Sequence, residues 1–384
     1  VLDSGNHRVQ KFNSSGQYVS QFGSYGTGQG QFLQPSGMAI DAQQNIYVVD
    51  PVNNNIQKFN SSGQYVDEFS VTLNGSQYSA ISPYGLAVDS AGNIYLTVPD
   101  SNGIRKYSPT GQLLQYVTHI DFNPPPGVPS APGRTEILLP GTIAIDGNDT
   151  IYIANPTQHR IVKLSDDFDF LGQFNPNNGW DSTPGECINW YIWWGAGWCP
   201  NYSGPLDFKP TSVTVDAVGN LYSIDTASNT VYKIRTDVRK GGYEVMPPNI
   251  TSAPNVGSLL INKFGTYGAG NGQFDRPLSI ALNSTNDIFI VDSNNSRVQK
   301  FSNGGEYQSQ FGSSISGTGF DNPSLMAEDS QHNVYVVDTG NNRVQKFSSN
   351  GQYISQFGSS GSTNGKFSQP SGIAIDTSDN VYVV

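Results

Sequence analysis

Cysteine, histidine and charged side chains are scarce in this chain. Its 384 residues include 2 cysteines and 4 histidines, and only 13% of them are charged. Acidic residues outnumber basic ones by 31 to 20, and Lys and Arg form no run. Proteins that bind nucleic acids use Lys and Arg to neutralise phosphates. The composition therefore predicts that nucleic acid is not a partner.

Long apolar runs are missing as well. No stretch of 18 apolar residues occurs, so the sequence predicts no membrane-spanning helix. The chain shows no signal peptide and begins with Val1 instead of Met, which is typical of a processed or excised piece of a longer protein. No segment has a convincing helical period, and this absence favours an all-β fold.

What the sequence does contain is a repeated unit of about 47 residues, clearest over residues 323–358. Its opening phrase starts at seven prolines: Pro35, Pro83, Pro140, Pro210, Pro277, Pro323 and Pro370. The last copy stops after about a third of a unit, and the beginning of the chain supplies the remainder. Repeats of this length that hold several short strands are typical of β-propellers.

Each unit has the pattern of four short strands. In the unit that begins at Pro35, strand-like runs occur at 37–41, 45–50, 55–59 and 64–69, separated by Asn, Gly, Ser and Asp. The first run holds small residues, as expected for the innermost strand of a crowded ring. The predicted fold is a single all-β domain over residues 1–384, a seven-bladed β-propeller of four-stranded antiparallel blades. Segments 1–34 and 370–384 are predicted to share one blade and so close the ring.

Several phrases carry a family resemblance. Residues 3–12 (DSGNHRVQKF) and 338–347 (DTGNNRVQKF) resemble the NHL repeat, as do residues 370–376 (PSGIAID) and 380–384 (NVYVV). The resemblance covers nearly the whole chain outside three insertions, and it implies a β-propeller. Members of this family serve as binding scaffolds, sensor domains, RNA readers and a few lyases, so the fold by itself does not assign a function.

The three insertions lie at about 121–139, 175–209 and 238–260, and the middle one holds every tryptophan and both cysteines. A Cys187–Cys199 disulfide would close a ring of about 13 residues and stabilise the loop by roughly 3 kcal/mol. Such a bond implies an oxidising compartment. The alternative is a metal pair, but two cysteines without a nearby histidine make a poor zinc site. We therefore predict an extracellular or cell-surface location.

The aromatic residues of the middle insertion are the candidate binding residues: Trp180, Trp190, Tyr191, Trp193, Trp194 and Trp198. Three interpretations stay open: a local core within the loop, a protein contact, and a carbohydrate site in which sugars stack on the indoles. The preferred hypothesis is a non-catalytic extracellular or cell-surface scaffold that contacts a protein partner, or assembles with itself, through this loop. A carbohydrate-binding, lectin-like propeller with glycan ligands is the alternative.

Glycosylation is a further prediction, because eight Asn-x-Ser/Thr sites fall in the sequence, in predicted turns. They begin at Asn13, Asn60, Asn74, Asn148, Asn201, Asn249, Asn283 and Asn294.

An enzymatic site, as in a propeller lyase or hydrolase, is the less favoured hypothesis. The seven innermost runs contain no His, Lys, Arg or Cys, and the histidines (His7, His119, His159 and His332) have no ligand spacing. General acid–base chemistry or zinc binding needs convergent groups. The sequence therefore predicts no catalytic residue, no metal site and no cofactor.

Acidic residues recur at fixed places in the unit. The innermost runs end at Asp41, Asp89, Asp146, Asp216, Asn283, Asp329 and Asp376. We expect these side chains to satisfy turn backbone, with a weak calcium site as the alternative. A second set comprises Asp50, Asp292 and Asp338, followed at a fixed offset by Arg8, Arg160, Arg297 and Arg343 in their units. We expect this second set to determine the fold through Asp–Arg or Arg–backbone bonds.

Overall fold

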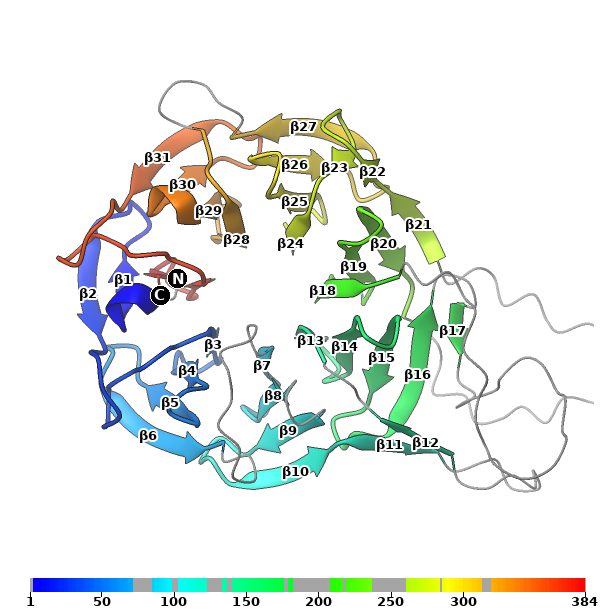
Figure 1. The fold of residues 1–384 in the computed structure, drawn as a ribbon, viewed down its shortest axis with the longest axis horizontal. Helices are drawn as coiled ribbons and strands as arrows, with labels where there is room; N and C mark the ends of the chain where they lie inside the picture. Colours follow the sequence, from blue (N-terminus) through cyan, green and yellow to red (C-terminus); the bar gives the residue numbers. More distant parts are fainter. Residues whose placement is uncertain are drawn as a thin grey trace, which may run out of the picture.

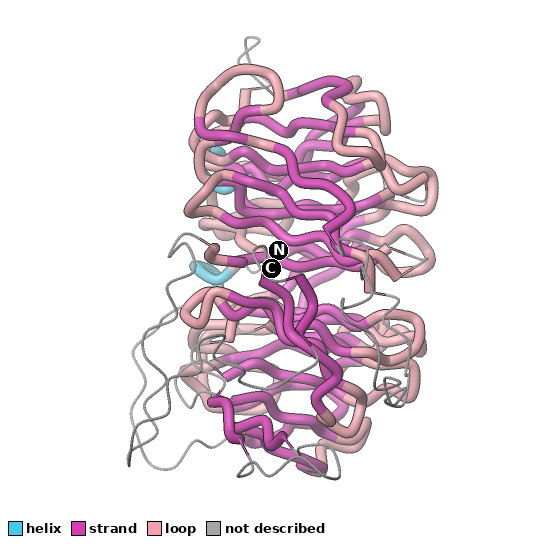
Figure 2. Tube along the Cα trace, turned by 90° about the vertical axis from the view of Figure 1, so that its right-hand side faces the viewer, coloured by secondary structure: helices cyan, strands magenta, loops and turns pink. Residues whose placement is uncertain are grey.

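The structure of the chain is a computed structural model. It describes residues 3–71, 85–98, 103–122, 133–136, 140–175, 179–181, 208–216, 219–236, 260–283, 285–312 and 319–383. These residues form a ring of β-sheets around a central axis (Figure 1). Viewed from the side, the ring has the shape of a disc (Figure 2). The arrangement confirms the predicted seven-bladed, all-β propeller.

Within the described residues, each blade is an antiparallel sheet whose strands follow one another from the centre outward. Six blades follow the chain order: β3 (Gly37–Ile40), β4 (Ile46–Asp50), β5 (Asn55–Phe59), β6 (Tyr65–Ser70); β7 (Leu86–Val88), β8 (Ile94–Val98), β9 (Gly103–Tyr107), β10 (Leu113–Val117); β13 (Ile143–Ile145), β14 (Ile151–Asn155), β15 (Arg160–Leu164), β16 (Phe170–Asn175), β17 (Gly179–Asp181); β18 (Pro210–Val215), β19 (Leu221–Asp225), β20 (Thr230–Ile234), β21 (Leu260–Phe264); β24 (Pro277–Leu282), β25 (Ile288–Asp292), β26 (Arg297–Phe301), β27 (Tyr307–Phe311); β28 (Pro323–Glu328), β29 (Val334–Asp338), β30 (Arg343–Phe347), β31 (Tyr353–Phe357).

The seventh blade joins the two ends of the chain. Its strands are β32 (Ile373–Ile375), β33 (Val381–Val383), β1 (Val9–Phe12) and β2 (Tyr18–Phe22), counted from the centre outward. Strands β1 and β33 pair antiparallel with Lys11 opposite Tyr382, so the ring closes within one chain as the sequence predicts. The two ends of the chain lie next to each other in both views (Figures 1 and 2).

Short elements complete the described chain. Strand β11 (His119–Phe122) pairs with β12 (Gly133–Glu136), and β22 (Thr266–Tyr267) pairs in parallel with β23 (Gln273–Phe274). Two single-turn 3-10 helices, η1 (Ser4–Asn6) and η3 (Thr339–Asn341), follow the same motif Asp in two blades. The hairpin β11–β12 is the described part of the first predicted insertion, and β17 belongs to the second. The rest of the three insertions lies largely outside the described residues.

The core lies between neighbouring blades. Each apolar cluster combines the second and third strands of one blade with the first two strands of the next, as when Tyr47 and Ile56 pack with Ile94 and Leu96. The second strands are buried along their whole length because both of their faces touch a neighbouring blade. This explains why runs such as residues 46–50 are continuously apolar apart from the terminal Asp.

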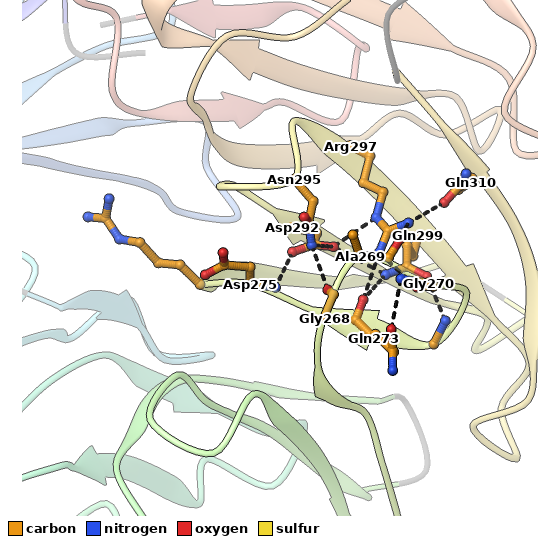
Figure 3. A network of polar contacts seen from close by, with 12 residues as sticks. Gly268, Ala269, Gly270, Gln273, Asp275, Asp292, Asn295, Arg297, Gln299 and Gln310 are labelled. Carbon is orange, nitrogen blue, oxygen red and sulfur yellow. Dashed lines mark hydrogen bonds and ion pairs between the residues drawn. The ribbon is translucent and has the colours of Figure 1, made fainter.

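A buried ion pair links the second and third strands of three blades. Arg297 donates through Nε to Asp292 at 2.8 Å, and its Nη1 and Nη2 donate to the carbonyls of Ala269, Gly270 and Gln273 (Figure 3). The same pairing joins Arg8 with Asp3 and Arg343 with Asp338. The arginine thus holds the loop that connects the preceding blade, and the predicted Asp–Arg bonds form in these three blades.

Candidate functional site

The ends of the seven innermost strands, which we call the inner rim, carry a repeated turn. In this turn Asp41 accepts hydrogen bonds from the Asn45 backbone at 2.7 Å, the Asn45 amide at 2.8 Å and the Tyr47 hydroxyl at 3.0 Å. Corresponding bonds surround the other rim carboxylates: Asp89, Asp146, Asp216, Asp329 and Asp376. The rim acids therefore hold their turns, as predicted from the sequence.

Tyrosine and lysine side chains complete this turn. Burial raises the pKa of the Tyr335 hydroxyl, and the negative charge of Asp329 raises it further. Lys346 lies 3.1 Å from Asp329. Burial alone would raise the pKa of Asp329, but hydrogen bonds from Asn333 and Lys346 outweigh it and lower that pKa. The carboxylate of Asp329 is thus ionised and engaged by its neighbours.

One blade departs from this pattern. Where other blades place Asp, Asn (Thr150 in one blade) and Tyr, the blade of β24 and β25 has Asn283, Asp287 and Phe289. The carboxylate has moved from the first position of the turn to the fifth, where Lys300 pairs with it at 2.8 Å. Hydrogen bonds from Lys300 and Asn283 outweigh burial and lower the pKa of Asp287. The blade therefore keeps its ion pair but has no tyrosine hydroxyl at the rim.

The next blade carries an acid where its sisters carry aliphatic residues. Glu328 is the last residue of β28, and the same place holds Ile40, Val88, Ile145, Val215, Leu282 or Ile375 in the other blades. Its side chain is only 13% exposed, and its Oε1 lies 2.6 Å from Nδ1 of His332, whose side chain is 40% exposed. Among the described residues, the buried Oε2 of Glu328 has no hydrogen-bond partner.

The surroundings of Glu328 favour its protonated form. Burial raises the pKa of the carboxyl group, and the negative charges of Asp329 and Asp287 add to the rise, while His332 opposes it. A half-buried acid with a raised pKa and an adjacent imidazole is the usual composition of a proton-transfer site. The Glu328–His332 pair is therefore the candidate functional site of the described chain.

A hollow occupies another part of the same rim. It has a volume of about 310 Å³, and the ends of β3, β7 and β13 line it. Its lining combines the aliphatic Ile40, Val88 and Ile145 with acids that include Asp149. Asp149 also links two blades, because it accepts hydrogen bonds from the backbone and hydroxyl of Ser90. The rim thus offers concave, partly apolar space beside its polar turns.

The sequence did not lead us to Glu328 or to its partner. The prediction of no catalytic residue depended on the absence of His, Lys, Arg and Cys from the innermost runs, and on histidines, His332 included, without ligand spacing. The useful signal was present, because Glu328 is the one acid at a place where six sister units have Ile, Val or Leu. The turn folds back so that His332 contacts Glu328. The four-residue separation of the two residues in the sequence does not reveal this contact.

The other described histidines at a shared repeat position have a structural role. Nδ1 of His7 lies 2.8 Å from the carbonyl of Leu33, and Nδ1 of His159 lies 2.8 Å from the carbonyl of Phe208. Both residues have a positive φ, so they end a tight turn and fasten it to a neighbouring loop.

Most of the aromatic residues predicted to bind lie outside the described residues: Trp190, Tyr191, Trp193, Trp194 and Trp198. Cys187 and Cys199 lie outside them as well, and the described part of the chain contains no disulfide. Trp180 lies in β17, where its backbone pairs with Phe174 of β16. Trp180 is thus the described member of this set, and its strand is the outermost one of its sheet.

The predicted glycosylation sites differ in their surroundings. Asn148 and Asn294 are exposed, whereas Asn13 and Asn60 are half-buried and their side chains hydrogen-bond within their own turns. Asn283 is only 6% exposed, and its amide donates to Asp287. Asn74, Asn201 and Asn249 lie outside the described residues.

No group of three or more His, Cys, Asp or Glu side chains in the described residues could hold a metal ion. None of their helices has the length and apolar character needed to cross a membrane.

Comparisons with known proteins agree with the blade geometry. Residues 1–95 match a family described as a 6-bladed beta-propeller, and residues 274–301 match the NHL repeat. Protein brain tumor of Drosophila melanogaster is 46% identical over 50 residues, which are 13% of this chain and 5% of that protein. The B-box type zinc finger protein ncl-1 of Caenorhabditis elegans is 33% identical over 66 residues, which are 17% of this chain and 8% of that protein.

Solved structures resemble the whole ring. A catalytically inactive variant of virginiamycin B lyase from Staphylococcus aureus, solved with quinupristin, matches 98% of each chain with a TM-score of 0.59 and 14% identity. Hydrazine synthase from Kuenenia stuttgartiensis matches 91% of this chain and 95% of its own, with a TM-score of 0.60 and 10% identity. At these identities the likeness shows the fold.

The fold and its repeated polar turns define a seven-bladed β-propeller, one blade more than the matched six-bladed family describes. The motif residues and the match at residues 274–301 assign its repeat further: the repeated unit is similar to the NHL repeat.

The predicted function needs correction. A non-catalytic extracellular or cell-surface scaffold with a disulfide-clamped Trp loop was expected, with a carbohydrate-binding propeller as the alternative. Lyases are instead among the solved propellers that match nearly the whole ring, and the described residues contain no disulfide. The prediction failed because it gave weight to the unusual composition of one insertion. It passed over Glu328, an acid at a rim position where the six sister blades have an aliphatic residue.

Proposed function

We propose that this propeller carries out proton-transfer chemistry of the lyase or hydrolase class at its inner rim, through Glu328 and His332. The observation that supports it most is the Oε2 atom of Glu328, which is buried and has no hydrogen-bond partner among the described residues. An unsatisfied buried carboxylate oxygen destabilises a fold, so its presence favours a functional role.

The two members of the pair have different tasks in this proposal. Glu328 is the proton carrier, because its environment keeps the protonated form accessible at a higher pH than in water. His332 is the more exposed member, and its contact with Oε1 fixes the carboxyl group in place. In a lyase, a proton leaves a substrate carbon and its electron pair expels the leaving group. Glu328 as carboxylate takes the first proton, and the resulting acid protonates the leaving group.

A substitution at Glu328 tests the function directly. Quinupristin is the first probe, because one of the solved lyase propellers contains it. Its conversion is followed by mass spectrometry with the wild type, with Glu328→Gln and with the control Glu68→Gln on an exposed strand face. We expect a loss of about 100-fold or more for E328Q and none for the control. Equal rates for E328Q and the wild type would contradict the proposal, whereas no conversion by the wild type would remove this substrate class.

The protein partner and the self-assembly expected from the sequence stay predictions. They concern the whole molecule and do not depend on the rim chemistry.

A further inference from the structure

One contact between blades differs from the other six at the inner rim. In six contacts, a tyrosine of one blade lies in the same apolar cluster as the last aliphatic residue of the next blade's innermost strand. The pairs are Tyr47 with Val88, Tyr95 with Ile145, Tyr152 with Val215, Tyr222 with Leu282, Tyr335 with Ile375, and Tyr382 with Ile40. In the seventh contact the corresponding residues are Phe289 and Glu328.

Phe289 in place of tyrosine and Glu328 in place of an aliphatic residue both fall at this seventh contact between blades. The six tyrosines donate their hydroxyls to the rim Asp of their own blades at 2.9–3.2 Å. Phe289 has no hydroxyl, and the Lys300 ammonium above its ring, 5.5 Å from the centroid, is paired with Asp287. The preceding blade therefore offers an apolar ring at the blade contact where its sisters place a tyrosine hydroxyl.

The surrounding exchanges fit this arrangement. With Asn283 in place of the rim Asp, the blade has no carboxylate at the place that a tyrosine hydroxyl would normally serve. Met326 and Val334 belong to the same apolar cluster as Phe289, and Val334 is the strand partner of Glu328. The carboxyl group of Glu328 thus lies at the edge of an apolar contact that extends across two blades.

We propose that Phe289 is a positioning residue for Glu328. By withholding the hydroxyl that six sister blades possess, it leaves Oε2 of Glu328 without a donor and so available for proton transfer. This inference rests on the proposed function of the Glu328–His332 pair and adds a residue from the neighbouring blade to that site. A hydroxyl at this place would stabilise the charged carboxylate, whereas the face of a phenyl ring does not.

A titration of Glu328 in variants of Phe289 tests this inference. The chain has only six glutamates, so [13Cδ]glutamate labelling gives a simple carbon NMR spectrum in which Glu328→Gln identifies the signal of Glu328. In Phe289→Tyr we expect the titration midpoint of Glu328 to fall by about one pH unit, because the added hydroxyl favours the ionised form. In the matched control Phe289→Leu, which is apolar and lacks a hydroxyl, we expect the midpoint to stay at the wild-type value.

The outcomes separate the two proposals. An unchanged midpoint in F289Y, or an equal shift in F289L, overturns the role of Phe289. The measurement does not depend on turnover, so full activity of E328Q would overturn the proposed function without affecting the titration result. Tyrosine occupies this place in six sister blades, so F289Y is expected to fold, and thermal melting of each variant confirms it.

Discussion

At the scale of single residues, Glu328 is the clearest departure of this chain from its own repeat. Six sister blades place an aliphatic residue at the end of the innermost strand, where it packs on the ring of the neighbouring blade. A carboxyl group in that place loses solvation, and among the described residues it gains His332 as a partner for Oε1 and none for Oε2. Residues that destabilise a fold in this way are typical of functional sites.

Replacing Glu328 by Ile, the residue of three sister strands, should stabilise the chain. We expect the free energy of unfolding to rise by about 1–3 kcal/mol at pH 7 and by less at pH 4. Because folding raises the pKa of Glu328, the folded chain holds this proton to a higher pH than the unfolded chain. The wild type therefore loses stability as the pH rises from the unfolded pKa to the raised folded pKa.

Urea unfolding of both chains at the two pH values measures this difference. Ile375→Val, a change at the sister position of another blade, serves as the control and should show no dependence on pH. A gain from E328I that is no larger at pH 7 than at pH 4 would refute the assignment of a raised pKa.

At the scale of elements, the buried arginine decides how a loop from one blade joins the next. Arg297 is 4% exposed, and its planar guanidinium reaches Asp292, Gln310 and three loop carbonyls at once. A lysine would keep the charge but cannot serve this many acceptors in one plane.

Arg297→Lys is therefore expected to destabilise the chain by roughly 2–4 kcal/mol, since several buried carbonyls lose their donor. The exposed Arg276 offers a matched control, for which Lys should change stability by less than about 0.5 kcal/mol. Thermal or urea unfolding checks both. Equal effects of the two substitutions would show that the network adds little to stability.

At the scale of the whole molecule, the ring depends on a blade that both ends of the chain build together. Strands β32 and β33 supply its inner half, and β1 and β2 supply its outer half. Because β1 pairs with β33, every blade finds its neighbours within one chain.

Deleting residues 370–384 removes β32 and β33 and leaves the inner edge of β1 without a partner. We expect the shortened chain to associate through this edge or to lose cooperative unfolding, because unpaired strand edges bind other strands. Light scattering would give the mass of one chain, 41.5 kDa, for the intact protein and a larger mass for the deletion. The same measurement tests the self-assembly predicted from the sequence, since an intact chain of higher mass would demonstrate it.

The sequence by itself determined the propeller, the number of blades, the shared closing blade and the structural roles of the rim Asp and the buried arginine. Each of these follows from a pattern that recurs among the units, because residues with the same structural role return at the same place in the repeat. Only the tertiary structure decided that Glu328 meets His332 and that Phe289 of another blade lies in the same apolar cluster as Val334, the strand partner of Glu328. These residues are exceptions to the pattern, and their proximity depends on a turn and on the packing of two blades. The order of residues along the chain reveals neither the shape of that turn nor the packing of those blades.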